Sequence, residues 1–341
     1  MAPSALGLPS TPGVIALSEE ERKAGKWSRA NLQRALELFH RDGLIVMSGI
    51  VPKEDLLKLR ENMMETADAV KAEKAGSPGK FNHGIMSNFL QAPPMSTPEL
   101  LFPSVYQNPY VIQIAEKYLG GGQIRMPFIT ANTAIANSTQ KQPIHKDCSF
   151  NHPLAPFMCI SNFLLDDFVP SNGSTEFWLG SHATTTPSEQ YWRSPESLAP
   201  TCDIIPDILE ERRKTRPPSQ VTVPFGSVLL RDPRTWHAGM PNSSDSDRIM
   251  VAVAYQAEWF TEDRRFKAPE SARALLTSNP NIIPLCEFYT DEEWNTFCQR
   301  WGNGEPMDLV YGPKPEGWVT IGDVAPEDKV LNHNFNPNAK G

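Results

Sequence analysis

Short apolar segments separated by turn-forming residues fill the middle of this chain, and they restrict its fold more than any other feature. Proline, glycine, asparagine and serine lie between the segments, which is typical of many paired strands. Hydrophobic residues make up 40% of the sequence, enough to fill a sizeable core. The pattern predicts a sandwich or barrel of strands. The segments are Met126–Ile135, Met158–Leu165, Thr175–Leu179, Gln220–Val223, Ser227–Arg231 and Ile249–Trp259.

Helical periodicity appears on both sides of this region. We expect one domain over residues 19–310, with a flexible N-terminal arm at 1–18 and a C-terminal tail at 311–341. A short apolar strand is expected at Leu44–Met47, and the chain from Gly302 on reads as loop. The expected helices are Trp27–Arg41, Lys53–Ala72, Asn108–Leu119 and residues 261–301.

Two long polar segments interrupt the pattern, Gly76–Pro98 and Ala183–Pro218. Loops of this length are often functional, and we expect both to close over the mouth of the barrel. The second contains the charge run Glu210–Lys214, which we interpret as the solvated face of a helix.

Composition excludes several classes of protein. The net charge is −8 and no block of Lys and Arg stands out, so nucleic acid is not an expected partner. The N-terminus has no signal-peptide pattern, and no stretch approaches the roughly 18 apolar residues that span a bilayer. Five widely spaced cysteines suggest reduced thiols. We therefore expect a cytoplasmic protein with a small-molecule substrate and no membrane partner, and a homodimer is left open.

Two His-x-Asp motifs occur, and only one suits a metal. His40 and Asp42 lie at the end of an expected helix, where residues two apart project about 200° from each other. His145 and Asp147 lie in a strand-rich region, where residues two apart point to the same side. The second pair can converge on one ion.

A third ligand is expected from another strand of the barrel. His237 follows an apolar segment and a turn, as a residue lining a barrel would. Two histidines and one carboxylate form the facial triad of non-haem Fe(II) oxygenases. Zinc accepts the same ligands, but a zinc hydrolase would need a general base that the sequence does not indicate.

Arg248 suggests the co-substrate. It comes eleven residues after His237 and begins an apolar strand. A buried Arg needs an anionic partner, and its planar fork fits a carboxylate, here the distal carboxylate of 2-oxoglutarate. The alternative is an ion pair at the rim with Asp245 or Asp247.

In these motifs the chain resembles the phytanoyl-CoA dioxygenase (PhyH) family of Fe(II)/2-oxoglutarate oxygenases, and within it the fungal enzymes that tailor secondary metabolites. Order and spacing of the motifs agree from about residue 30 to residue 260. The motifs are Phe39–Val46, Gln142–Asp147, Asn172–His182, and Trp236–Gly239 with Arg248.

The resemblance implies a double-stranded β-helix of eight core strands with flanking helices. It places His145, Asp147 and His237 on the iron ligands and Arg248 on the arginine that binds 2-oxoglutarate. It further implies that Gln142 and Thr175 contact this co-substrate, whereas His182 is interpreted as a turn residue. The resemblance also implies O₂ as the second co-substrate. Candidate substrate contacts are Asn82, His83, Phe150, Asn162 and Trp178.

Asn162 stands where a phytanoyl-type enzyme would carry an aromatic residue, and no cluster of cations for the phosphates of CoA is evident. We therefore expect oxidation of a C–H bond in a small, mostly apolar natural-product intermediate, by hydroxylation, desaturation, epoxidation or rearrangement. Three alternatives stay open: an acyl-CoA 2-hydroxylase of phytanoyl type, a zinc or manganese isomerase or hydrolase on the same barrel, and a non-catalytic cupin-like metal-binding protein.

Overall fold

The computed structural model describes residues 7–74, 82, 87–148, 155–192, 201–260, 264–300 and 309–311. Its helices are α1 (Glu19–Ala24), α2 (Arg29–Asp42), α3 (Lys53–Lys74), α4 (Pro103–Tyr106), α5 (Pro109–Tyr118), α6 (Pro206–Thr215), α7 (Arg273–Leu276) and α8 (Asp291–Arg300). Its strands are β1 (Gly13–Ala16), β2 (Leu44–Ser48), β3 (Asn88–Gln91), β4 (Ile124–Met126), β5 (Ile129–Ala134), β6 (Met158–Leu164), β7 (Glu176–Phe177), β8 (Ser219–Gln220), β9 (Val228–Arg231), β10 (His237–Ala238), β11 (Arg248–Ala257), β12 (Arg264–Pro269), β13 (Ile282–Pro284), β14 (Cys286–Tyr289) and β15 (Leu309–Tyr311).

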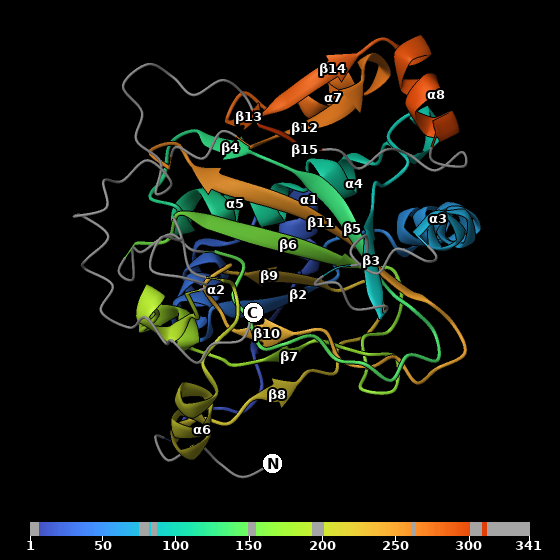
Figure 1. Cartoon of the computed structure of the whole chain (residues 1–341). Coiled ribbons are helices and arrows are strands. Elements are labelled where there is room, and N and C mark those ends of the chain that lie inside the picture. The colour runs from blue at the N-terminus through green and yellow to red at the C-terminus, as the bar shows by residue number, and fades with distance from the viewer. Residues whose placement is uncertain are drawn as a thin grey trace, which may run out of the picture.

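A large sheet and a small sheet face each other (Figure 1). The large sheet runs β1-β2-β9-β6-β11-β4-β13, with β5 also on β11 and β3 on β5. The small sheet runs β10-β7-β8, and an antiparallel bridge between His145 and His237 adds the segment around His145 to its edge. Four segments of each sheet (β5, β11, β6 and β9; the His145 segment, β10, β7 and β8) make the expected double-stranded β-helix.

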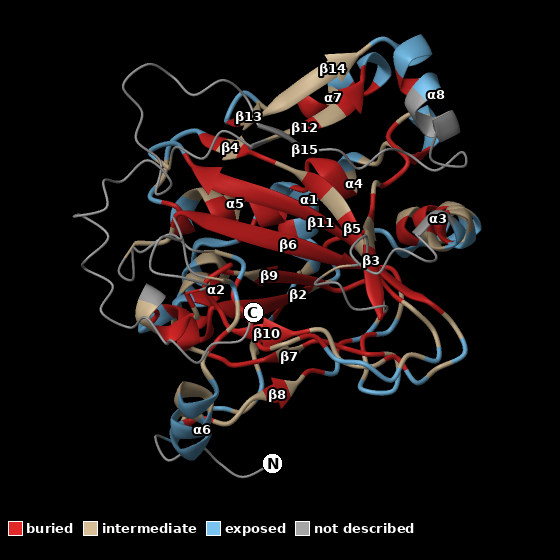
Figure 2. Cartoon of the chain, viewed as in Figure 1, coloured by how far each residue is buried: buried red, intermediate tan, exposed pale blue. Residues whose placement is uncertain are grey.

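Alternation along the strands separates two cores. Val228 and Leu230 of β9 belong to the larger cluster, which lies between the large sheet and the helices. Leu229, between them, belongs to a second cluster with Phe177, Leu179 and Val221 of the small sheet side, inside the barrel. Because neighbouring residues of a strand point to opposite faces, Arg231 lies on the same inner face as Leu229. The strands β2, β9, β6 and β11 are buried along almost their whole length (Figure 2), and only Ser48, Arg231 and Met250 are partly exposed.

The N-terminal helices cover the outer face of the large sheet. Ser28 accepts a hydrogen bond from the Asn31 amide and so begins α2, and Gly43 ends the helix with a left-handed φ of 70°. A side chain at Gly43 would meet Thr235 Oγ1 at 2.2 Å, so the turn between α2 and β2 also needs glycine for space. No described helix is long and apolar enough to cross a bilayer.

Four sequence predictions of secondary structure need correction. Residues 13–16, expected in the flexible arm, form β1 and pair in parallel with β2. Part of the loop expected at Gly76–Pro98 is β3, which pairs with β5. The region 261–301, expected to be helical, contains β12, β13 and β14, and β15 falls in the chain after Gly302, expected to be loop. The apolar residues of β12 alternate, since Phe266 and Ala268 are buried, and this period-two signal is short enough to be overlooked.

The charge run Glu210–Lys214 lies on α6, which has no buried residue, and this confirms its interpretation as a solvated helix face.

Candidate functional site

Two of the three predicted ligands come together through backbone pairing. The amide of His145 donates to the carbonyl of His237 at 3.0 Å, and the amide of His237 donates back at 2.8 Å. Residues paired in this way place their side chains on one face of the sheet. The two imidazole rings accordingly lie 4.3 Å apart between centroids, both buried.

Each ring is held with its Nε2 toward the barrel interior. Nδ1 of His145 is 2.8 Å from the carbonyl of Pro143, and Nδ1 of His237 is 3.0 Å from the carbonyl of Thr235. A carbonyl can only accept, so Nδ1 carries the proton and Nε2 the lone pair that a metal needs. Burial keeps the pKa of His237 well below its usual value, which favours the neutral, ligating form.

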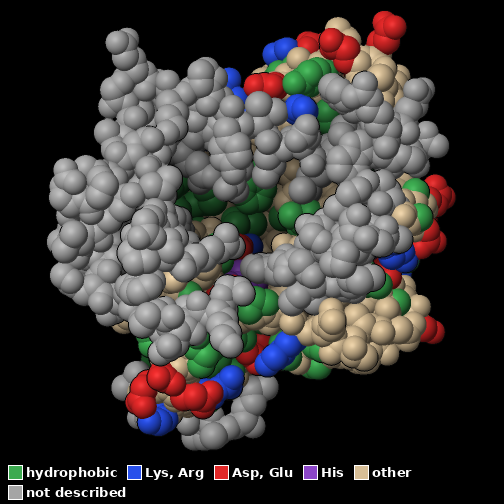
Figure 3. Space-filling model, in the orientation of Figure 1, with side chains coloured by type: hydrophobic (Ala, Val, Ile, Leu, Met, Phe, Trp, Pro, Cys, Tyr) green, Lys and Arg blue, Asp and Glu red, His purple; other side chains and the backbone are tan. Residues whose placement is uncertain are grey.

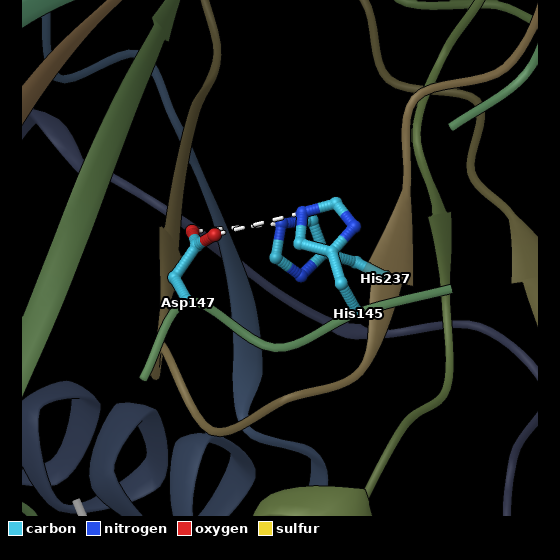
Figure 4. A group of neighbouring side chains, drawn as sticks. All are labelled: His145, Asp147 and His237. Carbon is cyan, nitrogen blue, oxygen red and sulfur yellow. Dashed lines mark ion pairs between the residues drawn. The ribbon is translucent and has the colours of Figure 1, made fainter. Parts of the chain in front are cut away.

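The carboxylate of Asp147 completes the group and faces both rings (Figure 4). Its Oδ1 lies 3.5 Å from Nε2 of His145, and its Oδ2 lies 3.6 Å from Nε2 of His237. All three ligand atoms fall within 4.8 Å of one another. Atoms that share one ion at about 2.1 Å stand roughly 3 to 3.5 Å apart, so the donor set fits a divalent metal.

An arginine holds Asp147 in its ionised form. Nη2 of Arg231 lies 2.5 Å from Oδ2 of Asp147. Burial alone would raise the pKa of Asp147, but Arg231, with His237 and His145, holds it well below its usual value. The carboxylate is therefore available as an anionic ligand at neutral pH.

Arg248 lies inside the barrel and keeps part of its fork unused. Nη2 donates to the carbonyl of Gly173 at 2.8 Å, and the guanidinium covers the ring of Phe168 at 4.7 Å. The residue is 3% exposed, and burial lowers its pKa to about 10. Nη1 is buried and has no hydrogen-bond partner in the described part of the chain.

The alternative of a rim ion pair with Asp247 is not formed. Asp247 pairs instead with Lys71 at 2.8 Å and accepts a hydrogen bond from the amide of Ala136. A buried guanidinium with an unsatisfied N–H is costly. A carboxylate from outside the chain fits this position, as the distal carboxylate of 2-oxoglutarate requires.

Thr175 and Asn162 face the same interior. Thr175 lies two residues before Phe177, whose ring stacks beside that of His237, and Asn162 lies two residues from Ile160 and Leu164 on the inner face of β6. Both are buried, at 5% and 3% exposure. Neither side chain forms a hydrogen bond to another described residue, so both keep polar atoms for a ligand.

Gln142 is held firmly by the chain itself. Its Oε1 accepts from the amide of Gly239 at 2.7 Å, and its Nε2 lies 3.4 Å from Oδ1 of Asn88. A side chain at position 239 would meet Oε1 at 2.6 Å, which explains the glycine in the Trp236–Gly239 motif. One N–H of the amide is left for the predicted contact with 2-oxoglutarate.

Trp178, predicted as a substrate contact, points away from the interior of the barrel. Its neighbour Phe177 faces His237, so strand alternation turns Trp178 to the outer face of the small sheet. There it is fully buried against Trp236 and beneath the guanidinium of Arg213. The structure thus does not bring it to the metal centre.

Asn82 is partly buried, and His83 and Phe150 fall outside the described residues.

An apolar wall begins beside the three predicted metal ligands. Ile160 on β6 pairs with Arg231, which holds Asp147, and Ala254 pairs with Ile160 from the other side. Cys148, the residue after Asp147, packs against the same cluster. Figure 3 shows a hollow on this face with hydrophobic side chains along it and a histidine at its floor. The wall consists of Phe157, Met158, Ile160, Ala252 and Ala254, with Phe128, Cys148 and Phe260 beside them.

The other described histidines are structural. His40 is on the surface at the end of α2, and its ring contacts Tyr118. His182 lies in the turn after Gly180 and its Nε2 is 3.0 Å from the carbonyl of His40. Neither approaches the three ligands, as their sequence contexts predicted.

Sequence reasoning missed Arg231 and most of the apolar wall. A signal for Arg231 existed: it follows Leu229 by two residues and so shares its inward face. The wall had no such signal, because small residues such as Ala252 and Ala254 line a cavity only once the opposing strands are known.

Fold and site together define a class: a double-stranded β-helix oxygenase with a two-histidine, one-carboxylate metal centre. The family model of phytanoyl-CoA dioxygenase (PhyH) matches residues 39–250, more than half of the 341-residue chain. The chain belongs to this family. It is an oxygenase that depends on Fe(II), with 2-oxoglutarate and O₂ as co-substrates.

Several solved structures have a similar fold, and the matched regions span about two-thirds of this chain. EctD from S. alaskensis in its apoform matches with a TM-score of 0.50 at 15% identity, covering 68% of this chain and 79% of that one. AviO1 from Streptomyces viridochromogenes Tue57 matches with a TM-score of 0.48 at 20% identity, covering 68% and 98%. The epimerase SnoN, in complex with Fe³⁺, alpha ketoglutarate and nogalamycin RO, matches with a TM-score of 0.48 at 16% identity, covering 67% and 85%. The likeness to EctD supports the shared barrel fold.

Proposed function

We propose that this oxygenase binds Fe(II) through His145, Asp147 and His237 and oxidises a C–H bond of a small, mostly apolar natural-product intermediate. The observation that carries the co-substrate assignment is the buried Nη1 of Arg248, which has no hydrogen-bond partner among the described residues. The iron centre supplies an oxidant able to remove a hydrogen atom from an unactivated C–H bond, with succinate and CO₂ as co-products.

Different residues of the site bind the metal and the co-substrate. The Nε2 atoms of the two histidines and Oδ1 of Asp147 hold the metal, while Nδ1 of each ring stays bound to a carbonyl. Arg248 binds the distal carboxylate of 2-oxoglutarate from within the barrel. Asn162 and Thr175, which have polar atoms to spare, orient the same molecule.

The apolar wall supports the substrate class. It starts beside Asp147 and continues through Ile160 and Ala254 to Phe157 and Phe260, whose rings lie 4.5 Å apart between centroids. Such a wall buries an apolar skeleton and excludes water from the reacting carbon. A CoA thioester would need several convergent cations for its phosphates, and the described residues of this wall carry none.

The test begins with an anaerobic spectrum of the Fe(II) protein with 2-oxoglutarate, in which we expect a weak visible metal-to-ligand band. Terpenoid, polyketide and alkaloid scaffolds are then compared with phytanoyl-CoA-type thioesters, and succinate release coupled to product is measured. We expect a shift of the band and coupled turnover with a free scaffold. Coupled turnover of the acyl-CoA alone would overturn the proposed substrate class.

A further inference from the structure

Arg231 lies at the metal centre and has no role in the function proposed so far. It is the last residue of β9, on the inner face of the barrel, and its side chain is 12% exposed. Its Nη2 lies 2.5 Å from Oδ2 of Asp147, the oxygen nearer to His237. The other oxygen of this carboxylate remains on the side of His145.

Only one edge of this guanidinium is used. Nη1 of Arg231 is buried and has no hydrogen-bond partner among the residues that the structure describes. An arginine fork presents parallel N–H groups that match a carboxylate, and a buried donor without an acceptor costs free energy. A role confined to Asp147 would leave that cost without compensation. An acceptor from outside the chain, close to the metal, removes it.

Arg231 and Arg248 enter the barrel at different levels. Arg231 pairs with Ile160, which pairs with Ala254, whereas Arg248 begins the same strand six residues earlier. Between the two levels lies Asn162, opposite Leu229 and Ala252. The interior therefore has two separate cationic positions with unsatisfied N–H donors, one beside the metal ligands and one remote from them.

We propose that Arg231 is a second carboxylate-binding residue of this site: Nη2 holds Asp147, and Nη1 donates to a carboxylate that lies at the metal centre. The proposal rests on the proposed function and extends it. The carboxylate has two potential sources, the 1-carboxylate of the 2-oxo acid co-substrate and an acid group of the organic substrate. Both present the same oxygen acceptors to Nη1.

The experiment compares Arg231→Lys with Arg248→Lys under anaerobic conditions. Lysine at 231 keeps a positive charge beside Asp147 but removes the second edge of the fork. The probes are Fe(II) alone, 2-oxoglutarate, and 2-oxopentanoate, which keeps the 2-oxo acid end and lacks the distal carboxylate. Affinities for the two acids are read from the visible band. Arg231→Gln, which is neutral, is the second variant, and thermal unfolding confirms that each variant is folded.

If the carboxylate bound by Arg231 is the 1-carboxylate of the 2-oxo acid, Arg231→Lys lowers the affinities for 2-oxoglutarate and 2-oxopentanoate by the same factor, tenfold or more. Arg248→Lys lowers only the affinity for 2-oxoglutarate. Affinity for Fe(II) alone should change no more than about threefold in Arg231→Lys, since a cation still faces Asp147.

A second arm tests a substrate acid. Benzoate is added to the Fe(II) protein saturated with 2-oxoglutarate, and the shift of the band is followed. If Arg231→Lys keeps both oxo-acid affinities but loses a benzoate response of the unsubstituted protein, the carboxylate comes from the substrate and the proposal stands. If the variants change Fe(II) affinity alone, or nothing, Arg231 only positions Asp147 and the proposal is overturned. An unsubstituted protein without any 2-oxoglutarate band would instead contradict the proposed function itself.

Discussion

The ammonium of Lys146 lies 3.4 Å from the carboxylate of Glu189. This ion pair connects the residue between two proposed metal ligands, His145 and Asp147, to a segment more than forty positions away. Lys146 also donates to Thr185 Oγ1 at 2.6 Å and to the carbonyl of Thr186 at 2.9 Å. Its side chain is 1% exposed and that of Glu189 is 10% exposed. Because side chains alternate along this segment, His145 and Asp147 point into the barrel and Lys146 points outward. There Lys146 holds the start of Ala183–Pro218, the segment expected to close over the barrel.

This contact makes Lys146→Met a destabilising change. Removing one partner of a buried ion pair leaves an uncompensated charge and typically costs about 3–5 kcal/mol. The double variant Lys146→Met/Glu189→Leu removes both charges and should recover most of that loss. Urea unfolding measures all the variants. A double variant no more stable than the single one would show that the pair is not the source of the effect.

The proposed metal centre leads us to expect that histidine variants differ sharply in Fe(II) binding and turnover. His145→Ala and His237→Ala each remove one of three ligands, so Fe(II) binding and turnover should be lost while the far-ultraviolet circular dichroism spectrum stays the same. Asp147→Ala should behave alike. His40→Ala, on the surface, is the control and should keep both properties. Iron content after reconstitution gives the measurement, and normal iron binding by His237→Ala would remove this triad from consideration.

We expect Arg248 to determine the affinity for 2-oxoglutarate. Arg248→Leu leaves the distal carboxylate buried without a partner, a loss of about 2–5 kcal/mol, so the apparent dissociation constant should rise well over tenfold. Fe(II) binding should be unchanged, because the side chain contacts Gly173 and Phe168 rather than the ligands. Titration of the visible band tests this. An unaltered affinity would mean that another cation binds the carboxylate.

Phe260 offers a test of the apolar wall. It is partly buried at the edge of the cluster, so Phe260→Ala should weaken binding of an apolar substrate by about tenfold, roughly 1.4 kcal/mol, and leave 2-oxoglutarate binding unchanged. Phe260→Leu keeps an apolar side chain and should lose less. Phe288→Ala makes the same change on β14, in a different sheet and outside the residues of the wall, and is the matched control. Equal effects at 260 and 288 on substrate binding would argue against the wall.

His182 makes stability depend on pH. Burial lowers its pKa to about 4 in the folded protein, against about 6.5 for an unfolded chain. The unfolded state thus binds a proton more readily, and folding stability should fall as pH decreases from about 6.5 to about 4, by at most roughly 1.4 kcal/mol per pH unit. His182→Gln can keep the hydrogen bond to the carbonyl of His40 and should flatten this slope. Urea unfolding between these pH values, with metal removed by a chelator, compares the two. Parallel slopes would rule out His182 as the cause.

The sequence by itself determined the family-level features of this protein. Strand periodicity and turn residues indicated the barrel, which the structure confirms, and the spacing of His145 and Asp147 placed both on one face of an extended segment. These are local properties, because the direction of a side chain in a strand follows from its position alone. The same kind of reasoning, applied to a helix, set aside His40, and His182 lies in a turn, as its motif was interpreted.

Only the tertiary structure decided which of these residues come together in space. Pairing of His145 with His237 brought the third ligand to the other two, and the register of β9 against β6 put Arg231 beside Asp147. Trp178 was misplaced because its motif does not reveal which face of its strand is inside. Register and strand order arise from contacts between residues far apart in the chain. Burial, which leaves Nη1 of Arg231 and Nη1 of Arg248 without a partner among the described residues, exists only after those contacts form.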